Sequence, residues 1–238
     1  MEILDPNLQE YLDNHCEPEP EHLQKINRDT YLKVLKPHML SGHYQGRLLS
    51  MLSKMMQPKR ILEIGTFTGY ATLCLAEGLT EDGIIHTIEV NRELEEMLNS
   101  HFKSTNVENK IKLHFGPAEL IIKELAAEIF DIVFIDADKK NNFTYFELIF
   151  DKVRSGGLII IDNVLWKGKV YGPENDADAI LEVNRSSSIS MGIPGKFFFN
   201  IVTKPFTCTA DCDGLLSICL GSPTIKSSTC SVNKYFFR

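Results

Sequence analysis

The stretch Asp131–Lys139, DIVFIDADK, and its counterpart Gly157–Asn163, GLIIIDN, decide the fold of this chain. Each begins as an apolar run that predicts a buried parallel strand, and each ends in acidic or amide side chains. In an open α/β sheet, ligands bind in the crevice beyond the carboxyl ends of the strands. If the two strands are neighbours, Asp136, Asp162 and Asn163 bring three hard oxygen ligands around one point. This set suits a divalent cation, Mg²⁺ first, with Ca²⁺ and Mn²⁺ as alternatives.

Outward from these two stretches, strands and helices alternate, which predicts βαβ units and an α/β fold. We expect a doubly wound, mostly parallel Rossmann-like sheet with helices on both faces and N-terminal helices added. Asn91 follows a strand and is expected to cap the next helix. The expected strands are Arg60–Ile64, Gly83–Glu89, Lys110–Phe115, Asp131–Asp136 and Leu158–Asp162, and the expected helices are Glu21–Leu35, Gly42–Met56, Tyr70–Gly78 and Asn142–Val153.

We expect one domain over residues 1–238, since this length buries a full core. Residues 1–57 form its N-terminal helices, 58–185 its core and 186–238 a divergent C-terminal edge, partly disordered in one reading. That last segment is rich in Ser, Thr, Cys and Phe and carries five basic and two acidic residues. Lys196–Lys204 and Leu215–Leu220 are expected to form two antiparallel edge strands.

The composition is that of an ordinary globular protein, with 43% hydrophobic and 24% charged residues. No apolar run reaches the roughly 18 residues of a membrane span, and the acidic N-terminus does not resemble a signal peptide, so a cytoplasmic protein is expected. A net charge of −7 counts against a broad nucleic-acid footprint. The six cysteines form no C-x-x-C pair, so we expect free thiols rather than a zinc site.

A second ligand site is predicted at Glu63–Tyr70, EIGTFTGY, which follows the first expected strand and opens a helix. Its E-x-G-x-x-x-G spacing differs from the G-x-G-x-x-G of dinucleotide sites, and its acidic residue would repel a pyrophosphate. A ligand with a cationic amino acid portion suits Glu63 better. Glu89, at the end of the next strand, is placed to take both hydroxyls of a ribose. The alternatives are a tight βα turn and a solvated strand end.

The motifs LEIGTFTGY, GPAEL, FIDADK and IIDN followed by VLWKG together resemble the cation-dependent O-methyltransferases, the S-adenosylmethionine enzymes that include the caffeoyl-CoA and catechol types. The resemblance covers about residues 39–185. It implies that the cofactor is held by Met39, Glu63, Gly65, Tyr70, Glu89, Ala118 and Asp136. It further implies that Asp136, Asp162 and Asn163 bind the metal, that Lys139 accepts a proton and that Trp166 packs on an aromatic substrate.

The chain departs from this family at Ala71, where Ser is usual, and at Phe143, where Tyr is common. Its C-terminal segment is also longer. Taken alone, Lys139 is better interpreted as a solvated strand-end lysine paired with Asp138, and Asp162-Asn163 as an Asx turn after a buried strand; the joint pattern favours the metal site.

Three functions are carried forward. The first is O-methylation of a small catechol-like or hydroxylated aromatic substrate, with Lys139 as general base. The second is the same reaction on a hydroxylated tRNA nucleotide, for which Lys33, Lys36, Arg47, Lys54, Lys59 and Arg60 would provide a basic patch. The third is cofactor binding without turnover. The resemblance also implies a homodimer.

Overall fold

The computed structural model describes residues 6–162, 197–202 and 215–219. Its strands form one seven-stranded sheet in the order β3-β2-β1-β4-β5-β6-β7, in which every neighbouring pair is parallel. The chain order reverses between β1 and β4, which is the point at which doubly wound sheets bind ligands. The strands are β1 (Arg60–Ile64), β2 (Ile84–Glu89), β3 (Ile111–Phe115), β4 (Phe130–Ile135), β5 (Val153–Asp162), β6 (Phe197–Val202) and β7 (Leu215–Cys219).

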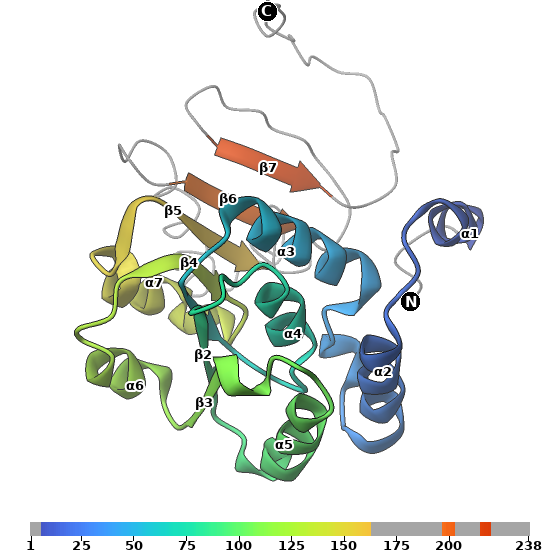
Figure 1. Ribbon diagram of the computed structural model, residues 1–238, viewed down its shortest axis with the longest axis horizontal. Coiled ribbons are helices and arrows are strands. Elements are labelled where there is room, and N and C mark those ends of the chain that lie inside the picture. Colours follow the sequence, from blue (N-terminus) through green and yellow to red (C-terminus); the bar gives the residue numbers. More distant parts are fainter. Residues whose placement is uncertain (1–5, 163–196, 203–214, 220–238) are drawn as a thin grey trace, which may run out of the picture.

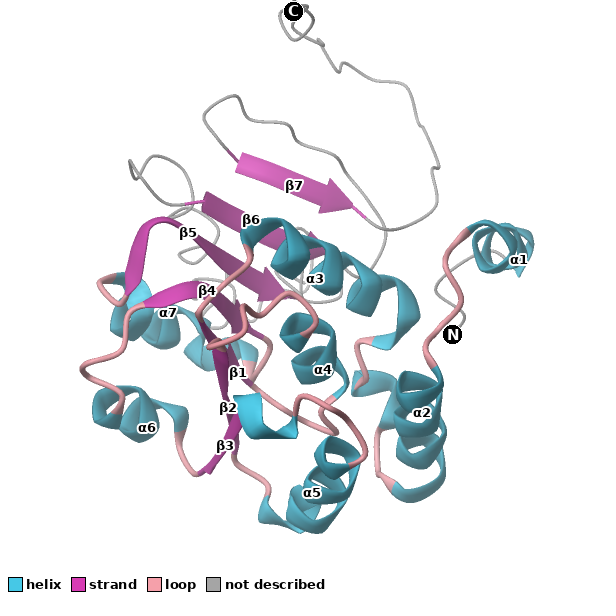
Figure 2. Cartoon of the chain, viewed as in Figure 1, coloured by secondary structure: helices cyan, strands magenta, loops and turns pink. Residues whose placement is uncertain are grey.

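Helices cover both faces of this sheet (Figure 2). The α-helices are α1 (Pro6–His15), α2 (Glu21–Lys33), α3 (Gly42–Met56), α4 (Tyr70–Ala76), α5 (Glu95–Lys103), α6 (Ala118–Glu124) and α7 (Asn142–Phe150). Short 3-10 turns lie at η1 (Pro37–Met39), η2 (Arg92–Leu94), η3 (Glu108–Lys110) and η4 (Lys139–Asn141). Figure 1 shows α6 and α7 on one face, and α2 to α5 on the other.

Alternation along the strands builds two separate cores, because successive side chains of a strand point to opposite faces. In β4, Ile132 and Phe134 pack with the α2–α5 layer, while Val133 and Ile135 pack with α6 and α7. All four side chains are fully buried. The near-continuous apolar run that predicted a buried parallel strand is therefore covered on both sides.

The expected core strands and helices are present, most with ends shifted by a few residues. Asn91 caps η2 as expected, since its Oδ1 accepts from the Glu93 N–H at 3.0 Å. Helices α1 and α6 were not among the expected elements.

The prediction of an antiparallel C-terminal edge is wrong, because β6 pairs with β5 and β7 with β6 in parallel. A parallel pair needs a connection of about a dozen residues or more. Residues 203–214 provide that length between β6 and β7.

In the part of the chain that the structure describes, no helix combines the length and apolar character that crossing a membrane requires. Cys16 and Cys74 are free thiols, the first exposed and the second buried.

Candidate cofactor and metal site

The loop after β1 is built around Gly65. Its N–H and that of Thr66 both donate to the Ile88 carbonyl, at 3.0 and 3.2 Å, which ties the loop to the end of β2. Gly65 has φ +100°, and a Cβ there would lie 2.4 Å from the Asp136 carbonyl oxygen. Glycine is required for both reasons. The loop predicted to bind the cofactor thus packs directly on Asp136, the residue after β4.

Glu63 lies beneath this loop with no exposed surface. Its Oε2 accepts hydrogen bonds from the hydroxyls of Thr72 and Thr87, and Thr66 bonds to Thr87 in turn. Among the described residues its Oε1 is buried without a hydrogen-bond partner. Burial raises the pKa of Glu63 to about 8, only partly offset by the two threonine hydroxyls. A buried oxygen lacking a donor suits a cationic group brought by a ligand.

The carboxylate of Glu89, at the end of β2, accepts hydrogen bonds from three backbone N–H groups. Its Oε2 accepts from Phe67 at 2.7 Å, and its Oε1 accepts from Val90 and Asn91 at 2.9 and 2.8 Å. Phe67 has φ +50°, a left-handed conformation that non-glycine residues adopt rarely. Glu89 therefore holds the loop in shape. A carboxylate has about four acceptor positions, so one remains for a ribose hydroxyl.

Three further predicted cofactor residues lie in different settings. The Tyr70 hydroxyl donates to Glu19, so this hydroxyl is already engaged within the protein. Ala118 is buried at the start of α6, and the Gly116 N–H just before it bonds to the Glu89 carbonyl at 2.9 Å. Met39, at the end of η1, is 56% exposed. The structure therefore brings Ala118 to the strand end that carries Glu89 and leaves Met39 at the surface.

Asp136 and Asp162 come together at the carboxyl ends of adjacent strands. Ile135 in β4 pairs with Ile161 in β5, so the next residue on each strand is one of the two aspartates. Asp162 is 2% exposed, and the Gln45 Nε2 donates to its Oδ2 at 3.1 Å. Two adjacent carboxylates at a strand edge are hard ligands of the kind that Mg²⁺ and Ca²⁺ take.

The rest of the predicted metal and substrate set is not described. Asn163 and Trp166 lie outside the described residues, and so does the side chain of Lys139. Within the described residues, no group of three His, Cys, Asp or Glu side chains is arranged to hold a metal ion. The predicted metal site has the Asn163 amide as its third protein ligand. Asp136 and Asp162 therefore fit a divalent cation as two of its three protein ligands.

Asp138 has a structural role next to this site. Its Oδ1 accepts from the Tyr145 hydroxyl at 2.7 Å and its Oδ2 from the Asn141 amide at 2.5 Å. Burial and the negative Asp138 carboxylate raise the pKa of Tyr145. Asp138 thereby fastens the backbone of η4, which begins at Lys139, to helix α7.

Several residues of the site escaped the sequence reasoning. Thr72 and Thr87 support Glu63, and Gln45 contacts Asp162, yet none belongs to a motif with a known spacing. The sequence signal that could have identified these residues is a polar side chain at a position where the helical or strand pattern predicts burial. Gln45 is such a residue, at 6% exposed on an amphipathic helix.

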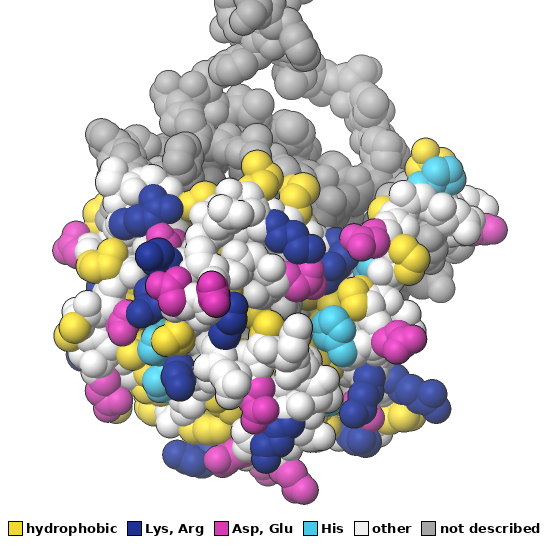
Figure 3. All heavy atoms as spheres, viewed as in Figure 1, with side chains coloured by type: hydrophobic (Ala, Val, Ile, Leu, Met, Phe, Trp, Pro, Cys, Tyr) yellow, Lys and Arg dark blue, Asp and Glu magenta, His cyan; other side chains and the backbone are white. Residues whose placement is uncertain are grey.

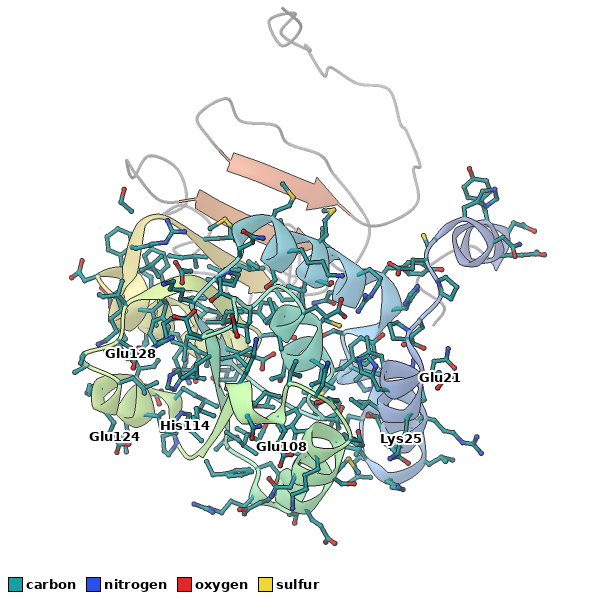
Figure 4. The ribbon with its side chains drawn as sticks, in the orientation of Figure 1. Glu21, Lys25, Glu108, His114, Glu124 and Glu128 are labelled. Carbon is teal, nitrogen blue, oxygen red and sulfur yellow. The ribbon has the colours of Figure 1, made fainter. Side chains whose placement is uncertain are left out.

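The basic residues named for a tRNA contact are largely engaged with acidic ones, as the mixed charges of Figure 3 illustrate. Glu128, labelled in Figure 4, takes the Arg60 guanidinium at 3.2 Å. The other pairs are Lys33–Asp29 at 2.8 Å, Arg47–Glu77 at 2.5 Å, Lys54–Glu77 at 2.8 Å and Lys59–Asp82 at 3.6 Å. A surface so paired offers little net positive field to a phosphate backbone.

Comparison with known proteins identifies the family. Residues 13–189 match the model of the family described as O-methyltransferase. The chain belongs to this O-methyltransferase family. Like its relatives with solved structures, this member of the family carries the Rossmann-like fold. Caffeoyl-CoA O-methyltransferase 1 of Zea mays is 38% identical over 162 residues, which cover 66% of this chain and 62% of the maize protein.

Two solved structures show the same fold around the methyl donor or its product. The O-methyltransferase TomG from Streptomyces achromogenes, involved in tomaymycin synthesis and solved in complex with S-adenosylmethionine (SAM), has a TM-score of 0.70 at 31% identity, covering 77% of this chain and 83% of TomG. The O-methyltransferase of Bacillus cereus, in complex with S-adenosylhomocysteine (SAH), has a TM-score of 0.71 at 28% identity, covering 77% and 84%.

Proposed function

We propose that the protein transfers a methyl group from SAM to a hydroxyl of a small catechol-like or otherwise hydroxylated aromatic compound, with a divalent cation at the acceptor. The observation that carries this proposal is the packing of Gly65 on Asp136. Through it, the glycine loop and the residues Asp136 and Asp162 lie at the same edge of the sheet. A methyl donor in the loop and an acceptor at the carboxylates are thereby brought within reach.

On the donor side, the chain offers a cationic ligand two carboxyl groups. The Glu63 Oε1 and the remaining acceptor position of Glu89 would take the amino acid end and the ribose of SAM. Gly65 and the backbone of Tyr70 would line the methionine end, and Ala118 the adenine. Met39 is assigned to the rim of the cofactor pocket.

On the acceptor side, Asp136, Asp162 and Asn163 would hold the cation, for which Mg²⁺ is the first choice. Such a cation supplies Lewis acidity that lowers the pKa of a phenolic hydroxyl, and it orients the oxygen. Lys139 would take the proton of that hydroxyl as general base. The substrate oxygen then forms a bond to the methyl carbon while the bond from that carbon to the sulfonium sulfur breaks. Trp166 would pack on the aromatic ring.

Two alternatives stay open to test. Methylation of a hydroxylated tRNA nucleotide is disfavoured by the ion pairs that engage Lys33, Arg47, Lys54, Lys59 and Arg60. A cofactor-binding protein without turnover would bind SAM and methylate no acceptor. Homodimer assembly and a cytoplasmic location stay predictions from the sequence.

The proposal is tested by following methyl transfer from labelled SAM to catechol, caffeate or bulk tRNA, with and without EDTA. We expect transfer to the small phenols, lost with EDTA and restored by Mg²⁺. Asp162→Ala should lower turnover by at least about a hundredfold, because the acceptor loses its activation, while SAH affinity stays within about threefold. Unchanged turnover in this variant would remove the metal assignment, and transfer to tRNA alone would replace the substrate class.

A further inference from the structure

Gln45 is a buried amide that reaches the proposed metal site from outside every motif. It lies on the first turns of α3 and is 6% exposed. Its Nε2 donates a hydrogen bond to the Oδ2 of Asp162 at 3.1 Å. Only the amide nitrogen can donate, so the carboxylate defines which way the amide of Gln45 is turned.

The backbone that carries Gln45 is firmly held. Gly46, the next residue, lies so close to α4 that a Cβ would be 2.6 Å from the Tyr70 ring. Further along α3, the Ser53 hydroxyl donates to the Leu75 carbonyl at 2.6 Å, and Arg47 pairs with Glu77 at 2.5 Å. Helix α3 is thus locked to α4, which follows the cofactor loop. Gln45 extends from this rigid support to the end of β5.

The amide suits a carboxylate that must keep its negative charge for a cation. It donates a hydrogen bond without neutralising the charge, which a lysine at this position would do. A glutamate would set a second negative charge against Asp162. The cation next along α3, Arg47, is directed to Glu77 and Cys74. The Gln45 amide therefore bonds to one oxygen of Asp162 without cancelling the charge of the carboxylate.

We propose that Gln45 is a positioning residue that holds the Asp162 carboxylate in the orientation needed to bind the divalent cation. The inference rests on the proposed function, because it presumes that Asp162 is a metal ligand. Carboxylates that bind metals are themselves held by hydrogen bonds, and loss of such a partner typically lowers metal affinity about 10- to 100-fold. Because α3 packs on α4, which follows the cofactor loop, Gln45 also connects Asp162 to that loop.

The test measures Mn²⁺ binding by electron paramagnetic resonance on the full chain without cofactor. Gln45→Met keeps the length of the side chain and removes the donor, and Gln45→Asn keeps the amide but withdraws it. Both should weaken Mn²⁺ binding by about 10- to 100-fold. Affinity for SAH, measured by calorimetry without metal, should stay within about threefold, because the hydrogen bond that both variants disrupt joins α3 to Asp162 and not to the cofactor loop.

Ser53→Ala is the matched control, since it also removes one buried hydrogen bond from α3. It should lower the melting temperature and leave Mn²⁺ affinity unchanged. If Gln45→Asn is folded and binds Mn²⁺ like the wild type while Asp162→Asn does not bind it, the positioning role is wrong and the metal site stands. If the wild type binds no Mn²⁺, the proposed metal site itself fails, and the role of Gln45 with it.

Discussion

Gly65 turns the chain out of β1 with φ +100°, and its missing side chain lets the loop touch the Asp136 carbonyl. Two residues earlier in the chain, Glu63 is buried, and one of its carboxylate oxygens accepts hydrogen bonds from two threonine hydroxyls. Each residue has a local cost, one in backbone conformation and one in desolvation. Both destabilising features lie where the methyl-donor and acceptor parts of the proposed site meet. Strain and desolvation of this kind are typical of functional sites.

Gly65→Ala should be much more damaging than Gly42→Ala. Gly42 also has positive φ, at +76°, but a Cβ there would meet nothing within 4 Å. Gly42→Ala should cost about 1 kcal/mol of unfolding free energy, from backbone strain alone. Gly65→Ala should cost about 1–3 kcal/mol more through the clash with Asp136, and should also weaken SAH binding. Urea unfolding and calorimetry measure both quantities, and equal costs at the two positions would contradict the packing argument.

Helix α2 supports the cofactor loop although it contributes no predicted site residue. Thr30 and Thr68 share a buried hydrogen bond at 2.9 Å, and the ring of His101 from α5 donates its Nδ1–H to the Thr68 carbonyl at 3.0 Å. His101 also lies 3.5 Å from Asp29 of α2. Helix α2 thus does more than cover the sheet, because it holds the backbone immediately before Gly69, the N-cap residue of α4.

Thr30→Val keeps the shape of the side chain and removes its hydroxyl. We expect a loss of about 1 kcal/mol of unfolding free energy, because Thr68 loses a buried partner. We also expect SAH affinity to fall severalfold as the loop becomes less ordered. Thr105→Val is the control, since it removes a hydroxyl bonded to the Phe102 carbonyl at the end of α5. SAH binding unchanged in Thr30→Val would show that α2 does not support the loop.

Over the whole molecule, an excess of acidic residues surrounds a sheet that buries several ionisable groups. The net charge is −7, and Lys33 on α2, Arg47 and Lys54 on α3 and Arg60 on β1 each pair with a carboxylate. Inside, Glu63 has a pKa of about 8. Burial lowers the pKa values of His86 and His114, whose rings lie side by side on β2 and β3, and the neighbouring His114 lowers the pKa of His86 further. Stability should therefore depend on pH at both ends of the neutral range.

The sign of the Glu63 contribution is clear. Between its ordinary pKa of 4.5 and about 8, folded Glu63 holds a proton that the unfolded chain has released. The unfolding free energy should therefore fall as pH rises, by up to about 1.4 kcal/mol per pH unit. His86 and His114 have the opposite effect on the unfolding free energy, which rises with pH through their contribution, and only below their ordinary pKa of 6.5. Between pH 6.5 and 8, Glu63→Gln should show a flatter profile than the wild type without cofactor. If the unfolding free energies of Glu63→Gln and the wild type change with pH in parallel, the group that holds the extra proton is not Glu63.

Much of this protein follows from local pattern. Apolar runs of strand length predicted β1, β2, β4 and β5, and the parallel register then brought Asp136 beside Asp162, because equal strand ends meet at one edge. The spacing of the glycine loop likewise predicted a turn that only Gly65 can make. These inferences needed nothing beyond the period of burial and the residues at each strand end.

Other features depended on packing between distant segments. Gln45 and Asp162 are 117 positions apart, and Thr30 and Thr68 are 38 apart, so no periodicity links them. The parallel pairing of β6 and β7 was likewise mistaken for a hairpin, because a run of apolar residues does not encode the direction of its partner. The sequence by itself determined the core strands of the parallel sheet and predicted the acidic residues at its edge. Only the tertiary structure decided which distant side chains contact that edge and the glycine loop, because the helices that supply them are positioned by long-range packing.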